Sequence, residues 1–196
     1  MQTVQPTANT SPRRVISLLV DNQSGVLARV AGLFNRRGFN IDTLTVSETN
    51  DPKISRITVT LRGDEQALRQ LILQTERLEV TRQIFELDPA NSLLRELLLL
   101  KVACDSKNRA ELREIASIYK AKIIDLSPDS MVLELTGKPE KIDAFLTMFR
   151  EYEILELCRT GVTALERGGK HQHMQKPRQE VRAAQFPLPG SPSGRP

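Results

Sequence analysis

The stretch DNQSGVLARVAGLFNRRGFNI, residues 21–41, carries the strongest fold signal in the chain. An apolar series with helical spacing fills its middle, and Arg36-Arg37-Gly38 follows with basic side chains and then glycine, as at a helix C-terminus. Strand-like segments lie on both sides, at 15–20 and 41–47. The predicted order is therefore strand, loop, helix over 25–37, and strand.

The loop that opens this helix has the features of a small-anion site. A helix that begins at Gly25 leaves several backbone N–H groups without an intrahelical partner. These groups and the helix dipole favour a carboxylate, and Asn22 can both donate and accept hydrogen bonds. The loop therefore suits a zwitterionic amino acid, although residues 21–41 alone are also compatible with a capped turn that binds nothing.

The same order of elements occurs twice along the chain, and each half reads as βαββαβ. The fold class is therefore α+β, with two ferredoxin-like βαββαβ units in tandem. In such a unit both helices cover one face of the sheet. The strand at 54–62 alternates apolar and polar residues, so we expect the face that carries Arg56, Thr58 and Thr60 to be uncovered.

The remaining bounds follow from periodicity, with Asp64 as a good N-cap for the second helix. Further strands are predicted at 80–87, 97–103, 122–126, 131–135 and 154–165, and helices at 109–119 and 139–150. A Pro- and Asn-containing segment at 88–92 separates an N-terminal domain, 13–88, from a C-terminal domain, 93–168. We expect 1–12 and 169–196 to be disordered, because the latter is rich in proline and poor in large apolar residues.

Several segments resemble the ACT domain, a module that senses amino acids, and in particular the small regulatory subunit of acetolactate synthase (acetohydroxyacid synthase). The resemblance covers residues 14–168. It rests on DNQSGVLARVAGLFNRRGFNIDTLTV at 21–46, DPKISRITV at 51–59, GDEQALRQL at 63–71, RELLLLKV at 95–102, TGKPEKIDAF at 136–145 and RTGVTALERG at 159–168. The first and the last of these are the most specific.

This resemblance implies a regulatory protein that acts on a separate, larger catalytic subunit. That subunit would carry thiamine diphosphate, Mg²⁺ and FAD and would condense two pyruvates, or pyruvate and 2-oxobutyrate, in branched-chain amino acid biosynthesis. The chain would activate it and confer feedback inhibition, with valine as the expected effector. ACT units of the family pair side by side as a homodimer and hold the effector between two chains. The matching effector-site positions are Asn22, Gly25 and Asn40, with Val26, Leu27 and Ile41 beside them.

The charge distribution argues against nucleic-acid binding. The chain has a net charge of +4, yet the segment from Arg167 onward holds six Lys or Arg and one Glu, so the first 166 residues carry −1. A nucleic-acid footprint is expected as a basic stripe on a folded surface. We also expect no membrane association, because no apolar run reaches about 18 residues and the N-terminus has no apolar signal core. The predicted location is cytoplasmic.

Catalytic and cofactor motifs are not found in the sequence. Gly63-Asp64-Glu65 resembles the start of a thiamine diphosphate motif, but Glu65 stands where backbone must approach phosphate. There is no GxGxxG or P-loop pattern. His171 and His173 have no third ligand nearby, so we expect no metal site. Cys104 and Cys158 lack a paired CxxC spacing, and both are expected as buried, reduced thiols in strands.

The sequence is also compatible with a second class of function. The chain could be a stand-alone amino-acid or metal sensor, such as an ACT-containing transcription regulator or a nickel-responsive regulator. A DNA-binding unit would need a helix-turn-helix or ribbon segment beyond the two predicted units, and a metal sensor would need His or Cys ligands within them. The regulatory-subunit hypothesis needs neither, because catalysis and cofactors belong to the partner.

Overall fold

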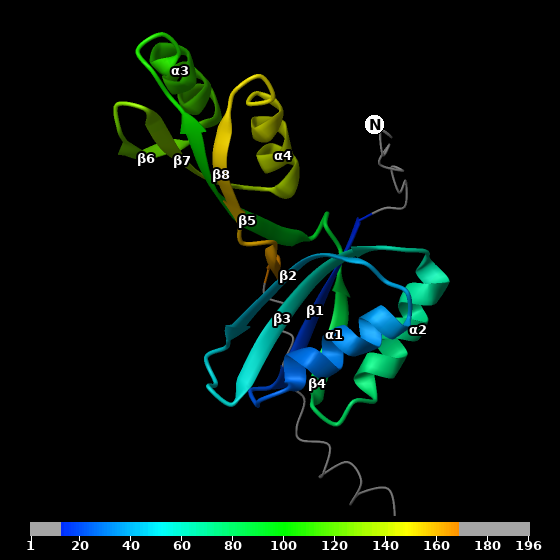
Figure 1. The fold of residues 1–196 in the computed structure, drawn as a ribbon. Coiled ribbons are helices and arrows are strands. Elements are labelled where there is room, and N and C mark those ends of the chain that lie inside the picture. The colour runs from blue at the N-terminus through cyan, green and yellow to red at the C-terminus, as the bar shows by residue number, and fades with distance from the viewer. Residues whose placement is uncertain (1–12, 169–196) are drawn as a thin grey trace, which may run out of the picture.

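The computed structural model describes residues 13–168, and the predicted disorder of 1–12 and 169–196 lies outside this part. Two antiparallel sheets, each with a pair of helices, lie one after the other along the chain (Figure 1). The predicted class, two ferredoxin-like βαββαβ units in tandem, is confirmed.

The first unit follows the predicted order of elements. Its sheet has the strand order β2-β3-β1-β4, so β2 and β4 are its edges. Both helices cover the same face of the sheet (Figure 1). The elements are β1 (Arg13–Asp21), α1 (Val26–Arg36), β2 (Ile41–Glu48), β3 (Ile54–Arg62), α2 (Glu65–Glu76) and β4 (Thr81–Leu87).

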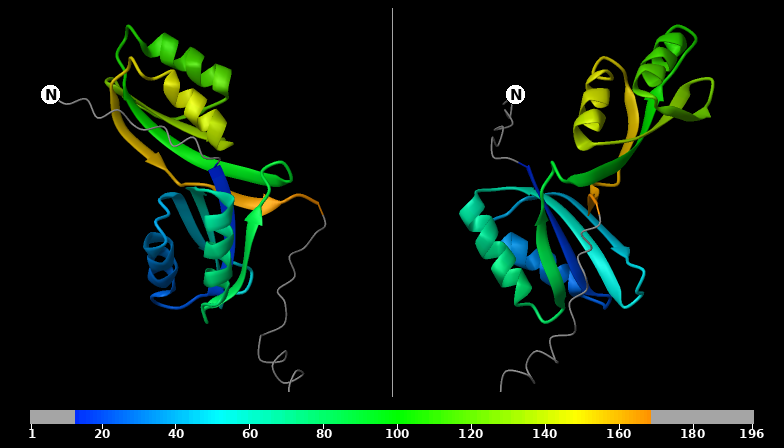
Figure 2. Two further views of the ribbon diagram at one scale, coloured as in Figure 1. Left: turned by 90° about the vertical axis from the view of Figure 1, so that its right-hand side faces the viewer. Right: turned by 180° about the vertical axis from the view of Figure 1, so that it is seen from behind.

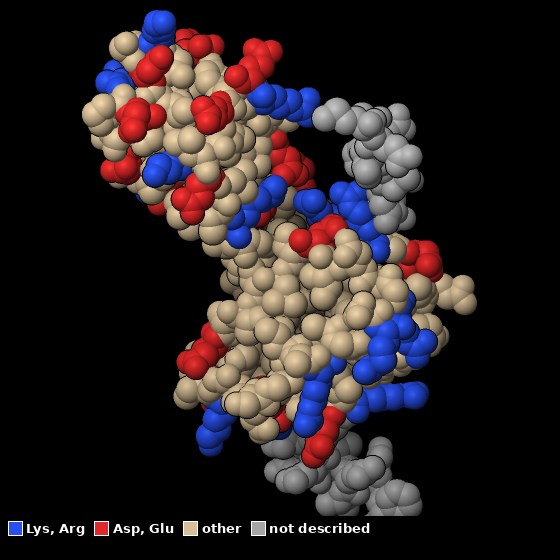
Figure 3. Space-filling view, viewed as in Figure 1, with Lys and Arg blue, Asp and Glu red and all other residues tan. Residues whose placement is uncertain are grey.

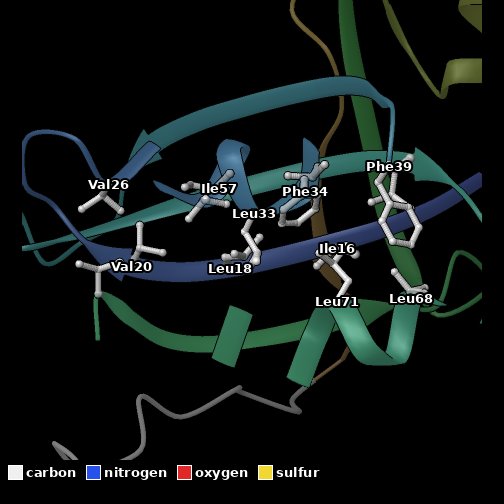
Figure 4. Packing of buried hydrophobic residues seen from close by; sticks show 14 residues of the cluster. Ile16, Leu18, Val20, Val26, Leu33, Phe34, Phe39, Ile57, Leu68 and Leu71 are labelled. Carbon is white, nitrogen blue, oxygen red and sulfur yellow. The ribbon is translucent and has the colours of Figure 1, made fainter. Parts of the chain in front are cut away.

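The core of this unit lies between the helices and the sheet. Val30, Leu33 and Phe34 of α1 and Leu68 and Leu71 of α2 pack onto the apolar face of β1 and β3 (Figure 4). The helical spacing seen in the sequence therefore corresponds to one buried stripe on each helix. Asp64 caps α2 as predicted.

The second unit has the strand order β6-β7-β5-β8, with β9 paired to the first part of β5. Its helices cover one side of its sheet, and β5 extends from this unit toward the first (Figure 2). The elements are β5 (Ser92–Ala103), α3 (Arg109–Tyr119), β6 (Lys122–Leu126), β7 (Ser130–Gly137), α4 (Pro139–Thr147), β8 (Ile154–Arg159) and β9 (Thr163–Glu166).

Several expected bounds in this half need correction, including those of β7, which spans Ser130–Gly137 and not 131–135. The single strand predicted over 154–165 is two strands, because Gly161 adopts φ 82° between β8 and β9. Strand β5 begins at Ser92, five residues earlier than predicted, because its first residues pair with β9. Helix α4 ends at Thr147, three residues before its predicted end.

The second face of the first sheet is covered, which contradicts the expectation that it is open. Thr58 and Thr60 are 2% and 0% exposed, whereas Arg56 is partly exposed. Val162, just before β9, and Ala164, within β9, pack there against Val15 and Leu87. Residues of both halves of the chain therefore contribute to this small apolar cluster.

The two cysteines also differ from expectation. Cys104 is buried directly after β5, but Cys158 is exposed on the edge strand β8. No helix in residues 13–168 has the length and apolar character that a membrane span requires.

Candidate functional site

The N-terminus of α1 has no side-chain cap among the described residues. Gly25 precedes the helix with φ 80° and ψ −5°. Its φ lies in the left-handed region that glycine adopts without a steric penalty. Helix α2, in contrast, is capped by Asp64, whose Oδ1 accepts a hydrogen bond from the Ala67 N–H at 2.8 Å.

The free donors of this helix end can be identified. The N–H of Val26 donates to the Gln23 carbonyl at 3.4 Å, a long contact. Within residues 13–168, the N–H groups of Leu27 and Ala28 donate to no backbone carbonyl outside α1. Together with the helix dipole, these donors favour a carboxylate at this position.

Asn22 holds the loop against the turn between β2 and β3. Its Nδ2 donates to Glu48 Oε1 at 3.0 Å and to the Pro52 carbonyl at 2.9 Å, and its backbone N–H donates to the Lys53 carbonyl at 2.8 Å. These bonds occupy the donor side of the amide. Its Oδ1 enters no hydrogen bond among the described residues, so it can accept one from a ligand ammonium.

The two apolar residues predicted beside this loop differ in their surroundings. Val26 is buried in the core near Val20 and Ile57 (Figure 4). Leu27 is 43% exposed. Of these two side chains, Leu27 is therefore the one that offers apolar surface to a ligand at the helix end.

Asn40 and Ile41 lie at the opposite end of the sheet from Asn22 and Gly25. Ile41 pairs with Leu61, which pairs with Arg14 near the start of β1, whereas Asp21 at the end of β1 pairs with Ile54. Seven residues of β1 separate these levels, about 23 Å at about 3.3 Å per residue. A single chain therefore does not bring the two halves of the predicted site together.

Asn40 and Ile41 line a cavity of about 530 Å³ between the two units. Near them Asp42 lies 3.8 Å from Arg13 Nε and 3.4 Å from Arg62 Nε. The full lining is Arg13, Asn40, Ile41, Asp42, Thr43, Leu44, Arg62, Glu96, Arg159, Thr160 and Gly161. This cavity could not be predicted from local sequence, because its walls come from segments far apart in the chain.

An ion pair between a buried carboxylate and a half-buried guanidinium lines this cavity. The Glu96 side chain is fully buried, and its two oxygens accept hydrogen bonds from Arg159 Nε at 2.6 Å and Nη2 at 2.7 Å. Arg159 Nη1 also donates to Asp143 on α4 at 2.8 Å. The bonds to Glu96 chiefly raise the pKa of Arg159, so the guanidinium stays charged. Residues 13–168 contain no group of three or more potential metal ligands.

Two family models match this chain, one in each of its two structural units. The AHAS small subunit-like ACT domain matches residues 16–83, and the C-terminal region of the small subunit of acetolactate synthase matches residues 95–168. The probable acetolactate synthase small subunit of Methanothermobacter thermautotrophicus is 45% identical over 157 residues, which are 80% of this chain and 94% of that one. The chain belongs to the acetolactate synthase small-subunit family.

Other members of the acetolactate synthase small-subunit family agree over nearly their whole length. The isozyme 3 small subunit of Escherichia coli is 40% identical over 81% of this chain and 98% of its own. The crystal structure of the Thermotoga maritima small subunit superposes with a TM-score of 0.74 at 34% identity, and the match covers 81% of this chain and 99% of that chain. The resemblance read from the segments within residues 14–168 is thereby confirmed.

Proposed function

We propose that this chain is the regulatory subunit of acetolactate synthase, which activates a separate catalytic subunit and makes it sensitive to a branched-chain amino acid, with valine as the first candidate. The family membership supports the partner. The regulatory role is supported by the uncapped start of α1. There, within the described part of the chain, the N–H groups of Leu27 and Ala28 have no backbone partner outside the helix, and Asn22, whose Oδ1 is unused, lies a few residues earlier in the sequence. Such a pair of groups suits an amino-acid carboxylate and ammonium.

The complete effector site would require two chains. Strand β2 is an edge of the first sheet, so its outer N–H and C=O groups can pair with another strand. The face over β2 and α1 carries few charged side chains in its middle (Figure 3), and charged residues are depleted at the centres of protein interfaces. A homodimer joined through β2 is therefore part of the proposal.

Such a dimer would unite the two halves of the site. Glu48, at the end of β2, contacts Asn22 of the same chain, while Asn40 and Ile41 lie at the start of β2. Two β2 strands paired around a two-fold axis run antiparallel, so the end of one lies beside the start of the other. Asn22 and Gly25 would then face Asn40 and Ile41 of the partner subunit, which gives two equivalent sites.

The test is reconstitution with the cognate large catalytic subunit, supplied with thiamine diphosphate, Mg²⁺ and FAD. Acetolactate formation is measured without this chain, with it, and then with valine, leucine or isoleucine. We expect the chain to raise activity, one of the amino acids to lower it, and the chain alone to form no acetolactate. Binding of an amino acid without any effect on the large subunit would instead indicate a stand-alone sensor.

A further inference from the structure

Residues 159–162, here called the joint, connect β8 of the second unit to β9, which lies against the first unit. On the second-unit side the joint is bonded to β5. The Thr160 N–H donates to the Leu97 carbonyl at 3.1 Å, and the Leu97 N–H donates to Thr160 Oγ1 at 3.1 Å. One residue earlier, Arg159 forms the bidentate pair with buried Glu96. The first half of the joint is therefore tied to the second unit.

The second half of the joint is tied to β2 of the first unit. Thr45 Oγ1 donates to the Val162 carbonyl at 2.9 Å, and the Val162 N–H donates to Thr43 Oγ1 at 3.4 Å. The backbone N–H and carbonyl of Val162 are thus both hydrogen-bonded to threonine side chains of β2. Val162 is also 1% exposed, in the small apolar cluster with Val15 and Leu87.

Gly161 lies directly beside Thr43 and Thr45 of β2. Its φ is 82°, and a Cβ added there would stand 3.1 Å from Thr43 Cβ and 3.3 Å from Thr45 Cγ2. Any side chain at this position would have to separate the joint from β2 or displace the threonines. The Arg159-Thr160-Gly161 motif therefore has a separate contact for each residue, and together these contacts connect the two units.

The strand that holds the joint also carries half of the proposed effector site. Asn40 and Ile41 lie three and two residues before Thr43 on the chain, and all three line the same cavity as Thr160 and Gly161. We propose that the joint transmits effector binding at β2 to the second unit, with Thr43 and Thr45 as the positioning residues; this inference rests on the proposed function above.

The physical requirement is that effector binding changes the position of β2 relative to the joint. A ligand can shift an equilibrium only through its different affinities for the two arrangements, and coupling between sites is a free energy that can be measured. Removing one hydrogen bond between β2 and the joint should weaken the coupling while the ligand contacts of Asn22, Leu27 and Asn40 remain. Loss of a single hydrogen bond corresponds to roughly a 2- to 10-fold effect.

The test uses full-length Thr45→Val in the reconstituted holoenzyme. Valine retains the shape of the side chain but cannot donate to the Val162 carbonyl. We expect the ratio of activity without effector to activity at saturating effector to fall about 2- to 10-fold. Basal activation should stay unchanged, and the effector Kd of the free small subunit, measured by calorimetry, should change less than about twofold.

Thr58→Val is the matched control. Thr58 pairs directly with Thr45 in the sheet and is equally a β-strand threonine on the covered face, but no described hydrogen bond joins it to residues 159–162. We expect the inhibition ratio of this variant to match that of the unaltered chain. Gly161→Ala is a second, independent variant, and its added methyl group should reduce the ratio in the same direction as Thr45→Val.

The outcomes separate this inference from the proposed function. If the unaltered chain binds and inhibits normally but Thr45→Val keeps its full inhibition ratio, the joint does not transmit the signal. A loss of inhibition that only reflects a weaker effector Kd would overturn the inference too. If no branched-chain amino acid binds the unaltered chain, the proposed function fails first, before any variant is compared, and the inference fails with it.

Discussion

Two residues of the α1 loop combine backbone shape with unused hydrogen-bonding capacity. Gly25 supplies a left-handed φ of 80°, and Asn22 anchors the loop through Nδ2 while its Oδ1 remains available. The local sequence is therefore shaped for an open helix end, since a Ser or Asp in the capping position would occupy the N–H groups that a ligand needs.

Gly25→Asp should abolish effector inhibition without loss of activation. The introduced carboxylate would repel the effector carboxylate and occupy the helix end, so we expect at least about a tenfold loss of effector affinity by calorimetry. Gly168→Asp is the matched control, because Gly168 also has a positive φ, 78°, and open space around its Cα. Equal inhibition of both variants by valine would show that the helix end is only a turn.

Asn22→Ala should weaken effector binding about several-fold to tenfold, through loss of the amide oxygen. The same change also removes the bond to Glu48, so Glu48→Ala serves as a control for loop anchoring. We expect Glu48→Ala to bind the effector within about twofold of the unaltered chain. If the two variants lose affinity equally, Asn22 acts only by holding the loop.

The ion pair between buried Glu96 and half-buried Arg159 predicts a stability effect. Arg159→Ala would leave the Glu96 carboxylate buried without its partner, which typically costs about 3–5 kcal/mol. Adding Glu96→Gln to that variant should recover part of the loss, because the uncompensated charge is removed. The measurement is the free energy of unfolding from urea titration, and additive losses in the double variant would contradict a direct coupling.

Strand β9 and the beginning of β5 act as a cover for the first sheet. Their apolar contacts form the small cluster around Val15, Leu87, Val162 and Ala164. This cover explains why a sheet face rich in threonine is buried, since Thr43 and Thr45 find partners in the Val162 backbone and Thr60. Buried hydroxyls are tolerated when they are hydrogen-bonded.

Leu87→Ala tests this packing between elements. Leu87 is 1% exposed in the small cluster, so its truncation should lower the free energy of unfolding by about 2–5 kcal/mol. Leu165→Ala is the control, because Leu165 on β9 is 56% exposed and its loss should cost less than about 0.5 kcal/mol. A similar small cost for both would mean that β9 does not pack on the sheet in solution.

At the level of the entire protein, the proposed dimer and the proposed effector site depend on each other. Val46→Lys places a charge on the exposed middle of the edge strand β2, which disfavours strand pairing. We expect a shift from dimer to monomer in sedimentation at micromolar concentration, with effector affinity lost in parallel. Leu73→Lys, on the exposed side of α2, should leave both properties unchanged. A monomeric variant with full effector affinity would contradict a shared site.

Much of the fold is a consequence of local pattern. The alternation in β3 and the helical spacing in α3 predict bounds identical to those observed, Ile54–Arg62 and Arg109–Tyr119. Asp64 marks a helix start because its carboxylate can cap it locally. The loop at 21–25 was likewise identifiable, because an open helix end requires only neighbouring residues. Periodicity and capping depend on contacts within a few residues, so they can be read along the chain.

The remaining features depend on contacts between distant segments. One hydrogen bond between β2 and the joint links the Thr45 side chain to the Val162 carbonyl. These two residues are 117 positions apart in the sequence. Nothing near Thr58 or Thr60 indicates that they are buried. A glycine such as Gly161 within a strand pattern is compatible with a break, but the division of the last strand is seen only in the separate pairing of β8 and β9 with β5. The distance between Asn22 and Asn40 within one chain is likewise a property of sheet register. Local spacing shows which face of an element is apolar, but only the folded chain specifies what covers the other face.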